Sequence, residues 1–96
     1  MTEGERETLL AHLSQHPEAG DIVPATGGVR KLRWAARGKG KRGGARVIYY
    51  FHNYDMPIVL FTVYLKAAKK DLTAAEKRHL RHVVPLIVEE FFRRKK

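Results

Sequence analysis

The sequence predicts an α+β fold, in which a small antiparallel sheet is preceded by one helix and followed by another. Leucines recur at helical spacing within residues 5–15. Three runs between residues 29 and 65 have the alternating or continuously apolar pattern of strands. Thr73 and Glu76 then have the spacing of a capping box at the start of a second helix. With 96 residues and 44% hydrophobic content, the chain suits one domain over residues 1–96.

The first helix is expected over residues 5–15, because three leucines share one face and Pro17 and Gly20 then end the segment. The stretch GDIVPATGG that follows, residues 20–28, is predicted to be a loop, since glycine and proline punctuate it. These two expectations place the first strand after Gly28.

Two strands are expected on either side of a glycine-rich basic connection. The first, VRKLRWAA at residues 29–36, alternates so that Leu32 and Trp34 share a face opposite the basic side chains. The second, ARVIYYFH at residues 45–52, puts four residues on one face: Arg46, Ile48, Tyr50 and His52. The connection RGKGKRGG has only glycines and cations, so it is expected to be exposed.

The third strand is expected at residues 58–65, IVLFTVYL, which is apolar on both faces. Such a run is typical of a strand covered on two sides. We therefore expect it to be the central strand, with the two preceding strands as its neighbours.

The second helix is expected from about residue 74, after the Thr73 and Glu76 capping box. Pro85 lacks the N–H of an interior helical residue, so we expect a break or kink there. The apolar residues beyond it, from Leu86 to Phe92, need cover, either from the sheet or from a partner protein.

The charge of the chain favours a polyanionic partner. Nineteen Lys and Arg oppose ten Asp and Glu, which gives a formal net charge of +9. No carboxylate occurs between Asp21 and Asp55, and all eight basic residues of that interval lie within residues 27–51. Nucleic acid is the first candidate partner. The alternative is a solvated hairpin, although such a hairpin would gain nothing from strong self-repulsion.

Several classes of protein are disfavoured. The sequence has no cysteine, so it has neither a disulfide nor a thiolate metal site. The N-terminus MTEGERETLL is acidic and does not resemble a secretory signal. The longest apolar stretch, PIVLFTVYL, is too short to span a bilayer. We therefore expect a soluble protein with no membrane partner.

Three segments together resemble the HigB-like branch of the RelE/ParE superfamily of bacterial toxins. They are TGGVRKLRW, then GKGKRGG and RVIYY separated by one residue, then the VY, K and KDLT positions of VYLKAAKKDLT. The similarity runs from about Leu9 to about Leu80. Relatives begin with a strand and a longer helical hairpin before the equivalent of Leu9. We therefore expect a truncated or misassigned start and a missing N-terminal strand.

The resemblance implies a RelE-like fold of two N-terminal helices on a small antiparallel sheet with a further C-terminal helix. It implies a cytoplasmic toxin of a type II toxin–antitoxin system, an endoribonuclease that cuts messenger RNA in the A site of the 30S ribosomal subunit and so inhibits translation. It implies no metal and no cofactor. The implied protein partner is a cognate antitoxin. The alternative function is non-catalytic, either ParE-like inhibition of DNA gyrase or binding of nucleic acid or antitoxin by an inactive relative.

The resemblance also implies the residues of the site. Arg46 stands where the family has its strand arginine, and its forked guanidinium suits a charged phosphate transition state. We expect Arg46 to be a surface residue, needed for cutting but not for folding. Neighbouring positive charge lowers the pKa of a lysine, so the candidate acids and bases are Lys39, Lys41, Lys66 and Lys69, with His52 ranked behind them. The predicted RNA-binding residues are Arg30, Lys31, Arg33, Arg37, Arg42 and Tyr50. Tyr50 has an equally good interpretation as a core or interface residue.

Overall fold

The computed structural model describes residues 2–35 and 44–95 of the chain. Within these residues an N-terminal helix, an antiparallel sheet and a C-terminal helix follow one another, so the predicted α+β fold class is confirmed. The elements are α1 (Glu3–Gln15), β1 (Asp21–Ile22), β2 (Arg30–Trp34), β3 (Ala45–Tyr50), β4 (Val59–Leu65) and α2 (Ala74–Lys95). The resemblance implied two helices before the sheet, whereas the described residues contain one.

The four strands form one antiparallel sheet in the order β1-β2-β3-β4. The expectation that residues 58–65 form the central strand is wrong, because β4 pairs only with β3 among the described strands. The central position belongs to β3, in which Val47, Ile48 and Tyr49 are fully buried. The apolar run of β4 predicted burial on both faces, but its residues are only half-buried or exposed. Because Arg46 interrupts the apolar pattern of β3, that pattern did not identify β3 as the more buried strand.

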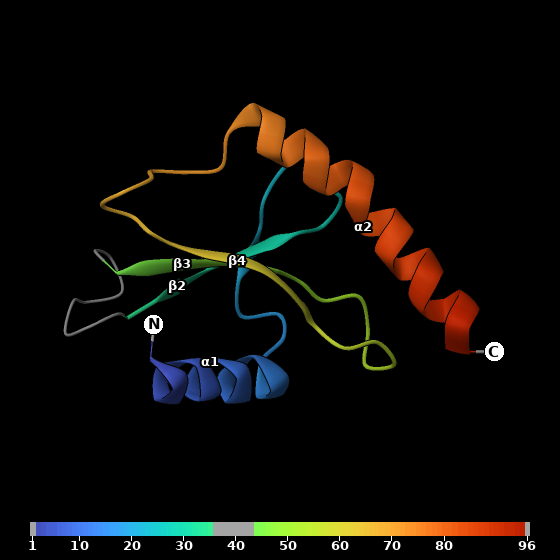
Figure 1. Ribbon diagram of the computed structural model, residues 1–96, viewed down its shortest axis with the longest axis horizontal. Coiled ribbons are helices and arrows are strands. Elements are labelled where there is room, and N and C mark those ends of the chain that lie inside the picture. Colours follow the sequence, from blue (N-terminus) through green and yellow to red (C-terminus); the bar gives the residue numbers. More distant parts are fainter. Residues whose placement is uncertain (1, 36–43, 96) are drawn as a thin grey trace.

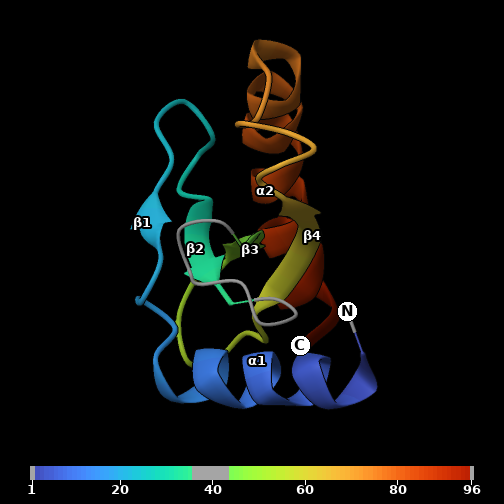
Figure 2. The ribbon, with the colours of Figure 1, turned by 90° about the vertical axis from the view of Figure 1, so that its left-hand side faces the viewer.

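The sheet lies between the two helices. Figures 1 and 2 show α1 beneath the strands and α2 along their other side. Leu9 and Leu13 of α1 pack on Val47 and Tyr49 of β3. The opposite face of β3 presents Ile48 to a second cluster, which includes the buried residues of α2. The two faces of β3 therefore hold two separate hydrophobic cores.

Tyr49 anchors the segment that connects α1 to β1. Its hydroxyl donates to the carbonyl of Pro17 at 2.8 Å and accepts from the N–H of Gly20 at 2.9 Å. Gly20 has no room for a side chain, since an added Cβ would lie 2.9 Å from a ring carbon of Tyr49. This connection delivers the chain to β1, where Asp21 pairs with Lys31 of β2. The segment predicted to be a loop thus contains a short edge strand.

The turn between β1 and β2 is closed by a buried threonine. The Thr26 hydroxyl donates to the Val23 carbonyl at 2.7 Å and accepts from the Val29 N–H at 3.1 Å. Gly27 and Gly28 follow with φ of 79° and 106°, the left-handed region that glycine adopts without steric cost. The turn brings β1 and β2 into register beside α2.

Helix α2 begins as predicted. Thr73 Oγ1 accepts from the Glu76 N–H at 3.1 Å, and Glu76 Oε1 accepts from the Thr73 N–H at 2.8 Å, so both halves of the capping box form. The expected break at Pro85 is absent, and one helix continues from Ala74 to Lys95. No helix of the described chain is both long enough and apolar enough to cross a bilayer.

The C-terminal half of α2 is only partly covered. Phe92 contacts the His52 ring at a centroid distance of 5.7 Å, and Phe91 meets Phe92 edge-on at 5.1 Å. Leu86 is 52% exposed. The apolar residues after Pro85 therefore pack partly on the end of the sheet and leave Leu86 to solvent.

Candidate nucleic-acid interface

Two arginines and a tyrosine, Arg33, Arg46 and Tyr64, form a row across three strands, which we call the arginine row. Arg46 of β3 pairs with Arg33 of β2 on one side and with Tyr64 of β4 on the other. Directly opposed residues on one face have Cβ atoms about 5 Å apart. Because Arg46 alternates with Val47 and precedes Ile48 by two residues, this row lies on the α2 face of the sheet.

Arg46 is buried, with 4% of its surface exposed. One guanidinium nitrogen donates to the carbonyl of Ala45 at 3.3 Å. The expectation that Arg46 is a surface residue, dispensable for folding, is therefore wrong in its premise. The physical reason is its place on β3, which is paired with β2 on one side and with β4 on the other.

Arg33, by contrast, is exposed and makes no hydrogen bond or ion pair within residues 2–35 and 44–95. Like charges directly opposite each other across strands are destabilising. The pairing of Arg33 with Arg46 places two positive charges side by side at this end of the sheet. A phosphate group suits the two guanidinium groups, since each can donate two hydrogen bonds to it.

Lys66 and Lys69 lie at the same end of the sheet. The N–H of Lys66 donates to the carbonyl of Gly44 at 3.1 Å, which places Lys66 next to the start of β3. The Lys69 ammonium pairs with Glu76 at 2.5 Å and lies 5.8 Å from the centre of the Tyr64 ring. The structure thus brings Arg33, Arg46, Lys66 and Lys69 to one end of the sheet.

Tyr64 is one of the residues near the site that were not predicted from the sequence. Its hydroxyl is buried and has no hydrogen-bond partner in the described part of the chain. Burial raises the pKa of the Tyr64 hydroxyl, Asp71 raises it further, and Arg46 opposes the shift. Tyr64 therefore stays a neutral hydroxyl beside the arginine row. The sequence shows a tyrosine in a strand, but its pairing with Arg46 depends on the register shift between Ile48 and Tyr49.

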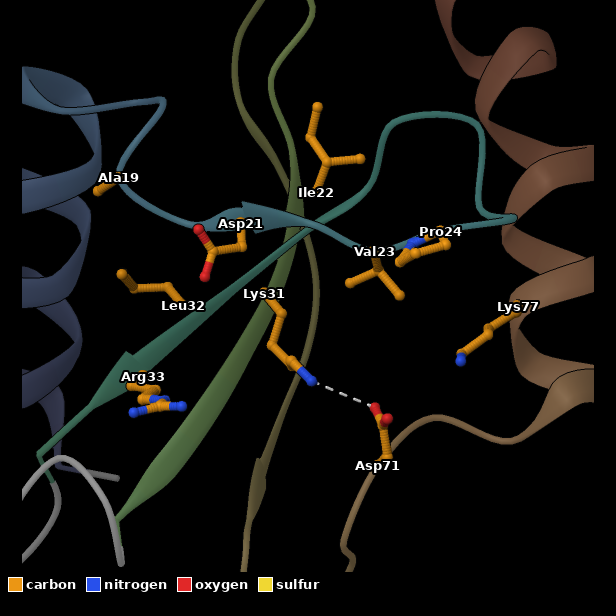
Figure 3. Close-up of a pocket in the computed structure, with 10 residues that line it drawn as sticks. All are labelled: Ala19, Asp21, Ile22, Val23, Pro24, Lys31, Leu32, Arg33, Asp71 and Lys77. Carbon is orange, nitrogen blue, oxygen red and sulfur yellow. Dashed lines mark hydrogen bonds and ion pairs between the residues drawn. The ribbon is translucent and has the colours of Figure 1, made fainter.

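A pocket of about 620 Å³ opens beside this end of the sheet (Figure 3). Its charged lining consists of Lys31 and Arg33 from β2, Asp21 from β1, Asp71 before α2 and Lys77 on α2. Its apolar lining is contributed by Ala19, Ile22, Val23, Pro24 and Leu32. Lys31 pairs with Asp71 at 3.4 Å, whereas Arg33 and Lys77 make no ion pair within the described residues.

The pKa of Asp71 lies below its ordinary value. The main cause is the N–H of Leu72, which donates to Asp71 Oδ1 at 2.7 Å, and the positive charge of Lys31 contributes further. Asp71 is therefore an ionised acceptor at neutral pH. It was not among the predicted site residues, because a single aspartate in a lysine-rich segment gave no signal of its own.

Arg30 lies apart from these groups. Its guanidinium donates to the carbonyls of Glu18 at 3.3 Å and Gly20 at 2.8 Å. It alternates with Lys31 along β2 and therefore points to the other face of the sheet. These contacts hold the segment between α1 and β1 to Arg30 of β2.

Tyr50 and His52 lie at the opposite end of the sheet. The Tyr50 hydroxyl and His52 Nδ1 are 2.9 Å apart, so the two side chains meet as their predicted common face requires. Four residues separate Tyr50 from Arg46 along β3, a distance of ~13 Å at the usual rise of a strand. His52 instead contacts Phe92 of α2. The structure therefore does not bring Tyr50 or His52 to the arginine row.

Four predicted residues, Arg37, Lys39, Lys41 and Arg42, lie outside the described residues. Comparison with known protein families finds no family model that matches the chain. The resemblance to the RelE/ParE superfamily accordingly stays a prediction.

The geometry itself is a cationic sheet end with a mixed polar and apolar pocket beside it. Such an arrangement can bind a phosphate backbone and contact one base.

Proposed function

We propose that this protein binds RNA through the cationic end of its sheet and acts as a ribosome-dependent messenger RNA endoribonuclease of a toxin–antitoxin module. The observation that carries the proposal is the direct pairing of Arg33 with Arg46. Two neighbouring guanidinium groups can each donate two hydrogen bonds to a phosphodiester. The net charge of +9 favours the same partner.

The chemistry of this proposal needs no metal. The 2′-hydroxyl of a ribose attacks the adjacent phosphate, the P–O5′ bond breaks, and a proton passes from the 2′-oxygen to a base and from an acid to the 5′-oxygen. Arg46 and Arg33 stabilise the negative charge on the phosphoryl oxygens. Lys66 and Lys69 are the described candidates for moving protons, since they lie at the same end of the sheet.

The second candidate function is non-catalytic, as in a ParE-like gyrase inhibitor or a protein that only binds nucleic acid. The position of His52 favours it, because the imidazole is bound to Tyr50 and lies far from the arginine row. The burial of Arg46 favours it as well, since a residue only 4% exposed contacts a phosphate less readily than an exposed one.

An antitoxin partner belongs to the same proposal. Two half-covered apolar surfaces support it. One is the C-terminal half of α2 around Leu86, and the other is the edge of β4 that pairs with no described strand, where Leu65 is 49% exposed. Apolar side chains that remain exposed on a small domain are typical of protein interfaces.

The test has two stages. Binding of single-stranded RNA is measured over a range of salt concentration, and a steep loss of affinity with salt is expected, since phosphate contacts release counterions. Toeprint mapping on translating ribosomes then shows whether messenger RNA is cut. Salt-dependent binding with cleavage supports the endoribonuclease, whereas binding without cleavage supports the non-catalytic function. Absence of salt-dependent RNA binding contradicts both RNA-based functions.

A further inference from the structure

The pocket shown in Figure 3 combines two kinds of chemistry that a plain phosphate site does not need. Arg33 and Lys77 supply positive charge from opposite sides, one from β2 and the other from α2. Asp21 and Asp71 supply carboxylates in the same pocket. A carboxylate repels a phosphate, so a ligand of this pocket must also offer hydrogen-bond donors.

Asp71 has one oxygen available for such a donor. The Leu72 N–H and the Lys31 ammonium both donate to Oδ1, at 2.7 Å and 3.4 Å. Oδ2 accepts no hydrogen bond within residues 2–35 and 44–95. The N–H of Leu72 fixes the carboxylate by a main-chain contact, so the orientation of the free oxygen is set by the backbone rather than by a mobile side chain.

The rest of the pocket fits a single nucleotide. Its volume of about 620 Å³ lies within the range of small-ligand pockets. Pro24 is the exposed apolar residue of the lining that follows β1, and it offers a surface for the face of a base. The pocket adjoins Arg33, which also belongs to the arginine row, so a nucleotide in it is continuous with a phosphate bound at that row.

We propose that this is a base-reading pocket, which accepts a nucleotide whose base has an exocyclic amino group and disfavours uridine. In this arrangement Arg33 and Lys77 bind the flanking phosphates, and Asp71 Oδ2 accepts a hydrogen bond from the amino group. Acceptance of the cytosine N4 amino group by a carboxylate is a known mode of base recognition. The inference rests on the proposed RNA binding and adds a base preference to it.

The test compares hexacytidylate with hexauridylate, which have the same backbone and charge and differ in base at the 4-position and in the proton that uracil carries on N3. Affinity is measured by fluorescence anisotropy with the full chain, at low and at high salt. The parent protein should bind hexacytidylate at least about fivefold more tightly, the lower end of what one good base contact discriminates. Equal affinities with a steep salt dependence would leave RNA binding standing and overturn the pocket. Failure of both oligonucleotides to bind would overturn RNA binding itself, and the pocket with it.

Asp71→Asn tests the role of the carboxylate. The Leu72 N–H keeps the amide oxygen at the Oδ1 position, so the amide nitrogen takes the place of Oδ2 and turns an acceptor into a donor. The preference for cytidine should disappear or reverse toward uridine, whose O4 is an acceptor. An unchanged preference in a variant with the parent's circular dichroism spectrum would overturn the inference.

Lys77→Ala tests the phosphate contact, and Arg78→Ala is its matched control. Lys77 lines the pocket, whereas Arg78 is the next residue of α2, equally basic and exposed away from it. Lys77→Ala should weaken both oligonucleotides alike and lower the salt slope by about one. Arg78→Ala should change neither. Equal effects of the two variants, or equally strong competition by hexaglutamate, would indicate a general anion-binding surface and overturn the pocket.

Discussion

Arg33 and Arg46 are direct cross-strand partners on one face of the sheet, yet Arg33 is exposed and Arg46 is almost completely buried. Proteins usually place opposite charges, or a charge and a neutral residue, at such positions, because like charges repel there. The pair therefore concentrates positive charge at this end of the sheet. Substitutions of the exposed Arg33 and of the buried Arg46 should therefore differ in their effects on stability and on RNA binding.

Arg33→Ala should raise the stability of the free protein, or leave it unchanged, while it weakens RNA binding. Removing the exposed member relieves a repulsion worth about 0.2 to 1 kcal/mol, and the gain should shrink at high salt. Urea unfolding at two salt concentrations measures the first effect. RNA titrations measure the second, with the salt slope expected to fall by about one.

Arg6→Ala is the control for this variant, because Arg6 is an exposed arginine on α1, the helix that covers the other face of the sheet. It removes the same charge without touching the row. If Arg33→Ala destabilises the protein and leaves RNA affinity at the value of Arg6→Ala, the arginine row is a structural feature and the proposed interface is incorrect.

Tyr49→Phe should lower the free energy of unfolding by about 1 to 3 kcal/mol, because it leaves two buried main-chain groups without a partner. The hydroxyl that it removes accepts from Gly20 and donates to Pro17, and Tyr49 is 0% exposed. Chemical unfolding followed by circular dichroism gives the difference. Tyr54→Phe, at a position 82% exposed, should have no measurable effect. Equal stabilities for the two variants would mean that the tyrosine does not hold the connection.

Glu76 should make stability depend on acid pH. Its hydrogen bond from Lys69, followed by that from the Thr73 N–H, lowers the pKa of the carboxyl from 4.5 to about 2. A lowered pKa in the folded state means that the unfolded chain takes up the proton first. The contribution of Glu76 is therefore complete above about pH 4.5 and is lost as the pH falls toward about 2.

The measurement is the urea midpoint of the parent and of Glu76→Gln at several pH values. The parent should lose stability between pH 4.5 and 2, and the variant should lose less over this interval. Glu89→Gln, on an exposed position of the same helix, is the control and should follow the parent. A variant whose pH profile coincides with that of the parent would show that the capping contacts of Glu76 do not survive in solution.

Local patterns predicted the fold class, the end of α1 and the start of α2, since these depend on neighbouring residues. The Thr73 and Glu76 capping box forms at the predicted position, and the leucine spacing of α1 predicts the buried Leu9 and Leu13. The order of the strands was not predictable in the same way. An apolar run such as β4 has the same pattern whether it is central or lies at an edge with half-covered side chains.

The candidate site, too, was predicted only where it depends on local patterns. Alternation along β3 predicted that Arg46 and Tyr50 share a face, and the four residues between them already imply a separation of ~13 Å along the strand. The pairing of Tyr64 with Arg46 depends on a register shift that no local pattern specifies. The contribution of Asp71 depends on its contact with Lys31, which is 40 residues away in the chain. Residues that meet only through tertiary contacts were therefore missed.

Arg46 gives the most demanding prediction, because folding and activity must be separated at one buried side chain. Arg46→Ala should lose about 1 to 3 kcal/mol of stability, since it truncates a side chain that is 4% exposed on the central strand. Loss of cleavage by this variant is thus not informative by itself. Arg46→Lys retains the charge and most of the apolar stem but not the forked guanidinium. It should stay folded and cut messenger RNA about a hundredfold more slowly or worse. Toeprint mapping on translating ribosomes measures cleavage, with urea unfolding as the folding control. Full activity of Arg46→Lys would exclude a bidentate phosphate contact from the mechanism, and an inactive parent chain would support the non-catalytic function instead.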